Sequence, residues 1–269
     1  MVLNHIKPHI SILNGEQIQK VHQDSLKVLS HTGIRVDSER ARAVFSEAVG
    51  GFDDNLVRIP GEIVEQALQS VPAQIDMYNR DGNLAFSMGG HQPSGTIYGI
   101  GVTNSWYQNP ENDSAIPFTR KHVEIATALG NTLTQFDLVS TPGVIQNDDT
   151  QMGEVVGTLE MMANTTKPLG ILISEPKQFD LALSMLEHLR GNLSQKPFVL
   201  PYFNPITPLV LNEDTTDKMF STIDHGLPFI FSSYGMSGAT APISAEGTLV
   251  MLNAELLAGL VFSQLIKPG

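Results

Sequence analysis

The sequence predicts an α/β fold in which helices cover a parallel sheet, and three observations predict it. From about residue 91 onward, apolar strand-like runs alternate with amphipathic helical segments. The runs are nearly continuous in apolar residues, as in strands buried on both faces. Each β-then-α unit is long enough to cross over between parallel strands. The expected strands cover residues 96–102, 136–140, 169–174, 198–203 and 229–233, and the expected helices cover residues 120–129, 150–163, 177–189, 214–224 and 248–266.

Both a doubly wound sheet and a (β/α)8 TIM barrel satisfy this pattern. No G-x-G-x-x-G turn follows the first expected strand, so the barrel is favoured. A complete barrel needs eight units and this chain supplies about five, so we expect an incomplete barrel in a C-terminally truncated chain. The last strand would then be an open edge, and Leu252, Leu256 and Val261 on the last helix would be exposed.

Residues 1–90 are expected to form a mainly helical N-terminal extension, and residues 91–269 the partial barrel. A helix from Asn14 is expected to end at Gly33, a second covers residues 38–49, and a third follows Pro60. Residues 75–90 are rich in Asn, Asp and Gly, and they indicate a hairpin around Asp81-Gly82.

Charge and composition exclude several classes of function. The formal net charge is -12, with 16 Lys+Arg against 28 Asp+Glu, which disfavours nucleic acid and anionic lipid as partners. The chain has no cysteine, which excludes disulfides and thiolate-bound metals. The first residues lack a signal-peptide pattern, and the apolar residues 249–266 indicate a buried helix. We therefore expect a cytoplasmic protein with no membrane partner.

Candidate substrate-binding residues follow the expected strands, because reacting groups in a barrel lie at the carboxyl ends of its strands. They are Tyr98, Glu175, Tyr202, Asn204 and Tyr234. Aromatic rings with one carboxylate suit an organic cation such as a quaternary ammonium. Two alternatives stay open: the rings fill the upper layer of the barrel, or Glu175 caps the helix that follows it.

No catalytic acid, base or nucleophile stands out from the residues. No two histidines have metal-ligand spacing, so we predict no bound metal, and His91 alone is expected near the barrel mouth. The sequence also has no Gly-x-Ser-x-Gly elbow and no phosphate-binding loop.

Several motifs carry a resemblance to a known family. Residues 236–243 read MSGATAPI, and they are followed by GTLV at 247–250, NAE at 253–255 and LAG at 257–259. Earlier segments are LSHTGIRV at 29–36, VRIPGEIVEQAL at 57–68, YGIGV at 98–102, NTTKP at 164–168 and NPITPL at 204–209. Together they resemble the trimethylamine:corrinoid methyltransferase family, which includes non-pyrrolysine relatives acting on glycine betaine and other quaternary amines.

The resemblance implies a (β/α)8 barrel that passes a methyl group from a methylated amine to the Co(I) corrinoid of a partner protein, the chemistry used in methanogenesis. The corrinoid (cobalamin) belongs to the corrinoid protein, so no cofactor is expected to bind this chain directly. The pyrrolysine of the trimethylamine enzymes would fall beyond Gly269. Ala241 departs from the Gly of many betaine-type relatives, yet GATAP at 238–242 is closer to that type. We expect a homo-oligomer.

Two rival hypotheses come from other classes. A barrel lyase or isomerase would need a Lys, His or metal site at the mouth. A non-catalytic small-molecule-binding barrel would have its pocket filled by side chains. Under the leading hypothesis, the 269-residue chain alone is expected to be inactive.

Overall fold

The computed structural model describes residues 11–51, 53–90, 95–101, 103–146 and 152–269. At its centre five strands lie side by side in chain order, each parallel to the next. They are β5 (Gly99–Ile100), β8 (Leu138–Ser140), β9 (Leu169–Ile171), β10 (Val199–Phe203) and β12 (Ile230–Phe231). The predicted parallel sheet is confirmed, with β5 and β12 as its edges and shorter than expected.

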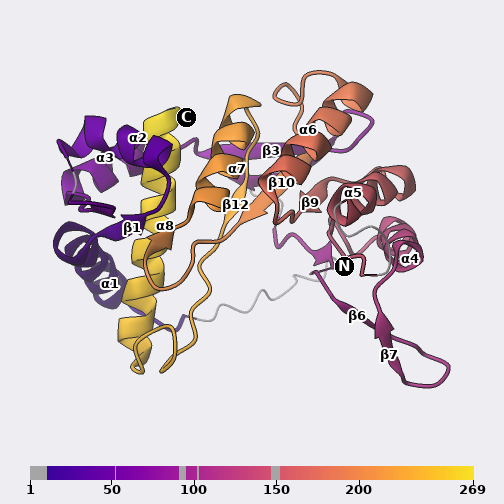
Figure 1. Ribbon diagram of the computed structural model, residues 1–269, viewed down its shortest axis with the longest axis horizontal. Coiled ribbons are helices and arrows are strands. Elements are labelled where there is room, and N and C mark those ends of the chain that lie inside the picture. The colour runs from indigo at the N-terminus through magenta and orange to yellow at the C-terminus, as the bar shows by residue number, and fades with distance from the viewer. Residues whose placement is uncertain (1–10, 52, 91–94, 102, 147–151) are drawn as a thin grey trace, which may run out of the picture.

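One helix follows each of these strands before the chain reaches the next. The helices are α4 (Arg120–Thr132), α5 (Gly153–Asn164), α6 (Pro176–Arg190), α7 (Glu213–Asp224) and α8 (Ala245–Ile266). Each packs against the next, and Figure 1 shows them crossing the molecule in chain order from α4 to α8. A doubly wound sheet reverses its strand order at a switch point. The central sheet has no reversal, so its crossovers place the helices in one layer.

The two faces of the central sheet are covered differently. On the helix face, Val139, Val199 and Phe203 join the main core, where the Phe203 ring lies 5.6 Å from that of Phe179 in α6. On the other face, Leu138 and Leu200 pack against Met77 and Phe86. The alternation of side chains along each strand explains why neighbouring residues belong to different clusters.

Met77 and Phe86 belong to the predicted hairpin, formed by β3 (Gln74–Tyr78) and β4 (Leu84–Gly89). Its backbone is tied to the segments that enter two central strands: the Tyr78 N–H donates to Pro197 O (2.8 Å), and the Arg80 N–H donates to Thr166 O (2.8 Å). Both acceptors precede their strands. The hairpin therefore lies at the amino ends of the sheet.

The predicted N-terminal helices are confirmed as α1 (Gly15–Lys27), α2 (Glu39–Val49) and α3 (Gly61–Ser70), and a π-helical turn (Val28–Thr32) extends α1. Asn14 forms a capping box with Gln17, and the Ser38 hydroxyl accepts from the Ala41 N–H. The π-helical turn ends at Gly33, where φ is +80° and an added Cβ would lie 2.6 Å from Val57 O. Only glycine fits there.

Short strands attach this segment to the rest of the chain. β1 (Ile34–Val36) pairs antiparallel with β2 (Leu56–Val57) and parallel with β11 (Val210–Leu211), which follows the carboxyl end of β10. The division at residue 90 stays a prediction. The pairing joins the N-terminal segment to the loop between β10 and α7.

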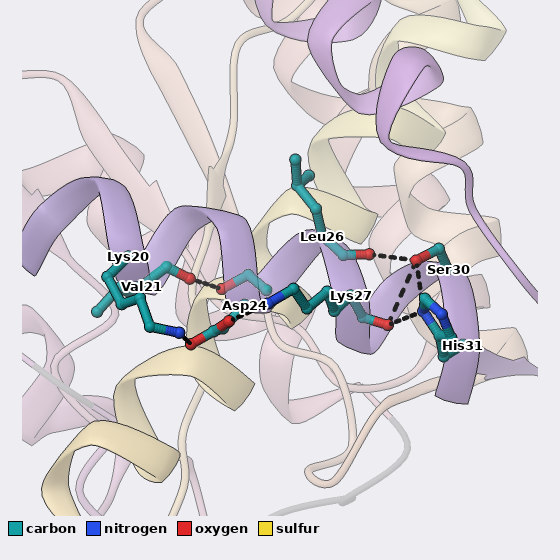
Figure 2. A network of polar contacts seen from close by, with 8 residues as sticks. Lys20, Val21, Asp24, Leu26, Lys27, Ser30 and His31 are labelled. Atoms are coloured by element: carbon teal, nitrogen blue, oxygen red, sulfur yellow. Dashed lines mark hydrogen bonds and ion pairs between the residues drawn. The ribbon is translucent and has the colours of Figure 1, made fainter.

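A polar network covers part of α1 and the π-helical turn (Figure 2). The Lys27 ammonium lies 2.9 Å from the Asp24 carboxylate, and Lys20 contacts the other carboxylate oxygen. Hydrogen bonds from Lys20 and then Lys27 lower the pKa of the Asp24 carboxyl. Further along, the Ser30 hydroxyl donates to Leu26 O (2.8 Å). These contacts are typical of the solvated face of an amphipathic helix.

Helix α8 lies against α1, α2 and α3, as Figure 1 also shows. Its length and hydropathy would suffice for a membrane span, but half of the apolar window is buried inside the protein, as in a core helix. Val261 is fully buried, Leu252 is partly buried and Leu256 is 38% exposed. The prediction that Val261 is exposed is therefore wrong, because Val261 belongs to the main core and α1, α2 and α3 pack against α8.

A small hairpin, β6 (Trp106–Gln108) and β7 (Ala115–Pro117), lies between β5 and α4 in the chain and projects away from the helices near α4 (Figure 1). The ring of Tyr107 stacks on His122 at 4.0 Å between centroids. His122 completes a capping box at the start of α4, since its Nδ1 accepts from the Thr119 N–H (3.1 Å). Only an imidazole unprotonated at Nδ1 can accept this bond.

Acid is expected to weaken the anchoring of this hairpin. Burial lowers the pKa of His122 below its usual 6.5, so the folded state disfavours the protonated ring. This contribution to stability is complete above about pH 6.5 and is lost as the pH falls through the lowered pKa. His122→Gln keeps the capping pattern without titrating. Urea midpoints at pH 7 and pH 5 should show wild type losing more stability than His122→Gln, while exposed His188→Gln tracks wild type. An equal loss for all three contradicts the prediction.

Three sequence expectations fall outside the described residues. They concern His91 at the mouth, Val102 at the end of the first strand, and Thr150 at the start of the second barrel helix.

Candidate functional site

The candidate site lies on the hairpin-facing side of the central sheet, toward its carboxyl ends. Leu200 and Tyr202 of β10, and Asn204 directly after it, alternate with residues of the helix face and lie on this side. Leu200 belongs to the cluster with the hairpin and forms a floor. Tyr202 and Asn204 lie successively further from that floor, toward the carboxyl end. The sheet therefore presents polar groups above an apolar base.

Tyr202 and Asn204 meet at Ser232, which follows β12. The Tyr202 hydroxyl hydrogen-bonds to Ser232 Oγ, and Asn204 Nδ2 donates to Ser232 O (2.8 Å) and Oγ (2.9 Å). The register pairs Tyr202 with Ile230, which brings Ser232 level with Asn204. The Thr215 hydroxyl holds the Asn204 carbonyl (2.9 Å). Thus two predicted residues share one polar cluster, whose third member the sequence did not single out.

Small residues occupy this side of the neighbouring strands. A Cβ added to Gly170 would lie 2.9 Å from Ser140 Oγ, and one added to Gly99 would lie 3.2 Å from Leu138 Cγ. Gly99, Ser140 and Gly170 therefore share the side of the sheet that carries Leu138.

Glu175 occupies the N-cap position of α6, at the carboxyl-end side of the sheet, and is exposed. Its side chain makes no capping hydrogen bond. Its loop is held by two other charged residues: the Glu154 carboxylate accepts from the Ser174 N–H (2.8 Å), and Lys218 Nζ donates to the Ile173 and Ser174 carbonyls (both 2.9 Å). The position is that of a cap, and the carboxylate itself remains open to a ligand.

The two remaining predicted residues lie apart from the cluster. Tyr98 was expected at a carboxyl end, but β5 begins at Gly99, so Tyr98 precedes it. Its N–H donates to Asp137 Oδ2 (2.8 Å), which places it at the amino end of the sheet, opposite Tyr202. That expected placement is wrong. Tyr234 follows β12 at the expected end, and 79% of it is exposed.

A cavity of about 590 Å³ lies elsewhere, and its lining is mostly apolar. It is bordered by Pro197 and Phe229, which precede β10 and β12, and by Leu260 of α8. A second, polar cavity of about 390 Å³ lies beside it, near His225 and Ser194. None of the predicted site residues lines either cavity, so a cavity shared by Tyr202 and Tyr234 stays a prediction.

Titratable groups do not gather as a metal site in the part of the chain that the structure describes, since no three His, Asp or Glu side chains there form a group that could hold an ion. The groups that do meet, at Ser232, are two hydroxyls, one amide and the ring of Tyr202. They can hydrogen-bond a ligand and offer a ring face to a cation.

A sequentially ordered parallel sheet with polar groups at its carboxyl ends is the architecture of an α/β protein that binds a small molecule at those ends. The chain belongs to the family described as "Trimethylamine methyltransferase (MTTB)", whose profile matches residues 1–269. The family resemblance seen in the sequence is confirmed.

Named relatives agree with this family. The chain is 29% identical over 263 residues to trimethylamine methyltransferase MttB of Desulfitobacterium hafniense (strain DSM 10664 / DCB-2), covering 95% of this chain and 52% of that protein. It is 28% identical to MttB of Methanosarcina barkeri (strain Fusaro / DSM 804), covering 97% and 54%. The glycine betaine methyltransferase of Desulfitobacterium hafniense (strain Y51) is 25% identical, covering 99% and 56%. The chain thus spans about half the length of these relatives.

A solved structure supports the fold. The crystal structure of the hydroxylamine MtmB complex superposes with a TM-score of 0.56 over 91% of this chain and 56% of that chain, at 11% sequence identity. Such a likeness shows the fold alone.

Proposed function

We propose that the whole protein transfers a methyl group from a methylated amine to the Co(I) corrinoid of a partner protein. The observation that carries this proposal is the match of the methyltransferase family over the full chain. Relatives named for trimethylamine and for glycine betaine support a methylated amine as the donor. The partner in this proposal is a corrinoid protein, and the setting is cytoplasmic.

The proposal includes the architecture of the complete protein. The five βα units form a sector of a (β/α)8 barrel, in which the side carrying Leu200, Tyr202 and Asn204 faces the barrel interior. The unbroken strand order and the single helix layer support this arrangement. The β3–β4 hairpin then lies at the bottom, and the methylated amine enters from the carboxyl ends.

The cluster at Tyr202 suits this chemistry. The corrinoid supplies the nucleophile, so the residues need only hold the amine with one methyl group directed outward. As the C–N bond breaks, the bonding pair stays on nitrogen and a quaternary amine leaves as a neutral amine, so no general acid is needed. The ring of Tyr202 attracts the cation without fully solvating it, which favours a transition state in which the charge is dispersed.

Replacing Tyr202 by leucine is expected to weaken binding of a quaternary amine by about 0.5–2 kcal/mol, the contribution of one cation–ring contact. Isothermal titration calorimetry with glycine betaine, tetramethylammonium and trimethylammonium measures the change. Tyr98→Leu is the matched control, because Tyr98 lies at the amino end of the sheet. Unchanged affinity in Tyr202→Leu, or an equal loss in Tyr98→Leu, contradicts the placement of the site.

Cobalt methylation tests the function as a whole. Reduced Co(I) corrinoid protein is mixed with a panel of methylated amines, and the absorbance change on methylation is followed. The 269-residue chain and a chain of the relatives' length are assayed side by side. Turnover with at least one amine by the longer chain is expected. Failure with every amine would overturn the proposed function, and turnover by the shorter chain would show that five units suffice.

A further inference from the structure

Glu255 is a buried acidic residue in the middle of α8, and only 2% of it is exposed. The Leu209 N–H donates to its Oε1 (2.6 Å), the Thr207 hydroxyl donates to its Oε2 (2.9 Å), and the Ser233 hydroxyl donates to Oε2 as well. Within the described ranges no ion pair involves Glu255. Burying a carboxylate is costly unless hydrogen-bond donors compensate, so these three donors are what holds it there.

The donors come from two different loops at the carboxyl ends of the sheet. Thr207 and Leu209 belong to the segment between β10 and β11, and Ser233 follows β12. Leu209 has a φ of +57°, in the left-handed region that a leucine rarely adopts. Its N–H is held by Glu255 and its carbonyl accepts from the Arg35 N–H (2.9 Å). Glu255 therefore stabilises a strained backbone conformation.

The same two loops carry the candidate site. Asn204 begins the segment that includes Thr207, and Ser232 directly precedes Ser233. The Asn204–Ser232 hydrogen bonds join the two loops on one side, and Glu255 joins them on the other. The arrangement also joins two separate sequence motifs, NPITPL and NAE, because Glu255 of the second accepts from Thr207 and Leu209 of the first.

We propose that Glu255 is a positioning residue for the methyl-transfer site, because it clamps the loops after β10 and β12 so that Tyr202, Asn204 and Ser232 converge. The inference rests on the proposed function for its catalytic meaning. Its structural part stands independently. Glu255 does not touch the amine, and it acts through the backbone of Leu209 and the hydroxyls of Thr207 and Ser233.

Two substitutions separate the effect of the hydrogen bonds of Glu255 from the effect of its negative charge. Glu255→Gln can keep all contacts but one: its Oε1 accepts from the Leu209 N–H, and its Nε2 donates to a hydroxyl oxygen of Thr207 or Ser233. Glu255→Ala removes every contact. We expect Glu255→Ala to lower kcat/KM for the preferred amine by about 10- to 100-fold, as misplacement of site groups does. Glu255→Gln should restore most of this loss.

Amide hydrogen exchange supplies a measurement that needs no activity. In Glu255→Ala the Leu209 amide and residues 232–234 should exchange at least about tenfold faster than in wild type, because local opening becomes easier. Glu255→Gln should stay close to wild type. Glu246→Ala, an exposed acidic residue in the first turn of the same helix, is the matched control and should change neither exchange nor kcat/KM.

The outcomes separate the two proposals. If the wild-type protein fails to methylate cobalt with every amine tested, the proposed function is overturned. The hydrogen-exchange data still decide whether Glu255 holds the two loops together. Unchanged loop exchange in Glu255→Ala overturns the clamp even if activity is present. Faster exchange with unchanged kcat/KM overturns the positioning role. An equal loss of kcat/KM in Glu255→Gln and Glu255→Ala assigns the role to the charge instead.

If Glu255→Ala does not fold, Thr207→Val takes its place, because it removes one donor at constant shape. Faster exchange and lower kcat/KM are again expected.

Discussion

Replacing Phe262 by alanine is expected to lower the free energy of unfolding by about 3–5 kcal/mol, as is typical for a buried phenylalanine. Phe262 is fully buried in α8. Its ring stacks on Phe45 of α2 (5.5 Å between centroids) and meets the edge of Phe220 in α7 (5.3 Å). It thereby joins the N-terminal helices to the helix layer of the sheet. The alanine variant leaves a cavity at the junction of three helices.

The urea midpoint and slope of each variant measure this loss. Leu249→Ala on the same helix is the control, because 43% of Leu249 is exposed and its truncation removes little buried area. Phe262→Leu should fall between wild type and alanine. A loss below that of Leu249→Ala would contradict the packing of α8 against the N-terminal helices.

Replacing Lys218 by methionine is expected to cost about 1–3 kcal/mol, because the carbonyls of Ile173 and Ser174 each lose a buried donor. Methionine fills nearly the same volume, so packing around the side chain is retained. Only 8% of Lys218 is exposed, and burial lowers the pKa of its ammonium, against the opposing effect of the carboxylates of Asp214, Glu154 and Glu175.

The pH dependence of this variant has a definite sign. Because the folded state disfavours the charged ammonium, the cost of its burial is present at neutral pH and is relieved as the pH rises toward the unfolded pKa of 10.5. Wild type should therefore gain stability relative to Lys218→Met between neutral pH and pH 10. Exposed Lys177→Met, at the start of α6, should stay within about 0.5 kcal/mol of wild type. No loss in Lys218→Met at pH 7 would show that the two carbonyls find water instead.

The helix and strand pattern was predictable because its signals are local. Asn14 and Ser38 cap helices through atoms three residues away, and Gly33 and Gly50 adopt positive φ where helices end. The hairpin around Asp81-Gly82 and the five βα units follow from periodicity and turn residues in the same way. Strand ends were less predictable: the run 96–102 is mostly apolar, but among its described residues (96–101) only Gly99–Ile100 pair with a neighbouring strand, and so Tyr98 was assigned to the wrong end.

The candidate site was predictable only in part. Tyr202 lies near the end of one expected strand, 198–203, and Asn204 follows two residues later, so a common face could be inferred from their spacing. Nothing in the sequence marks Ser232 as a site residue, since a serine after a strand is common. Its place in the cluster comes from the register between β10 and β12. Glu255 lies 48 residues from Thr207, in a segment predicted as an apolar helix. Nothing near it in the sequence indicates which loop it contacts.

By itself, the sequence determined the α/β class, the order of the βα units and the family, because capping, periodicity and motif identity depend on residues close together in the chain. Only the tertiary structure decided which side of the sheet carries Tyr202, that α1 to α3 pack against α8 and Val261 is buried, and that Glu255 joins two loops. These depend on strand register and on contacts between distant segments. A buried charge is stable only where donors converge on it, and that convergence exists only in the folded chain.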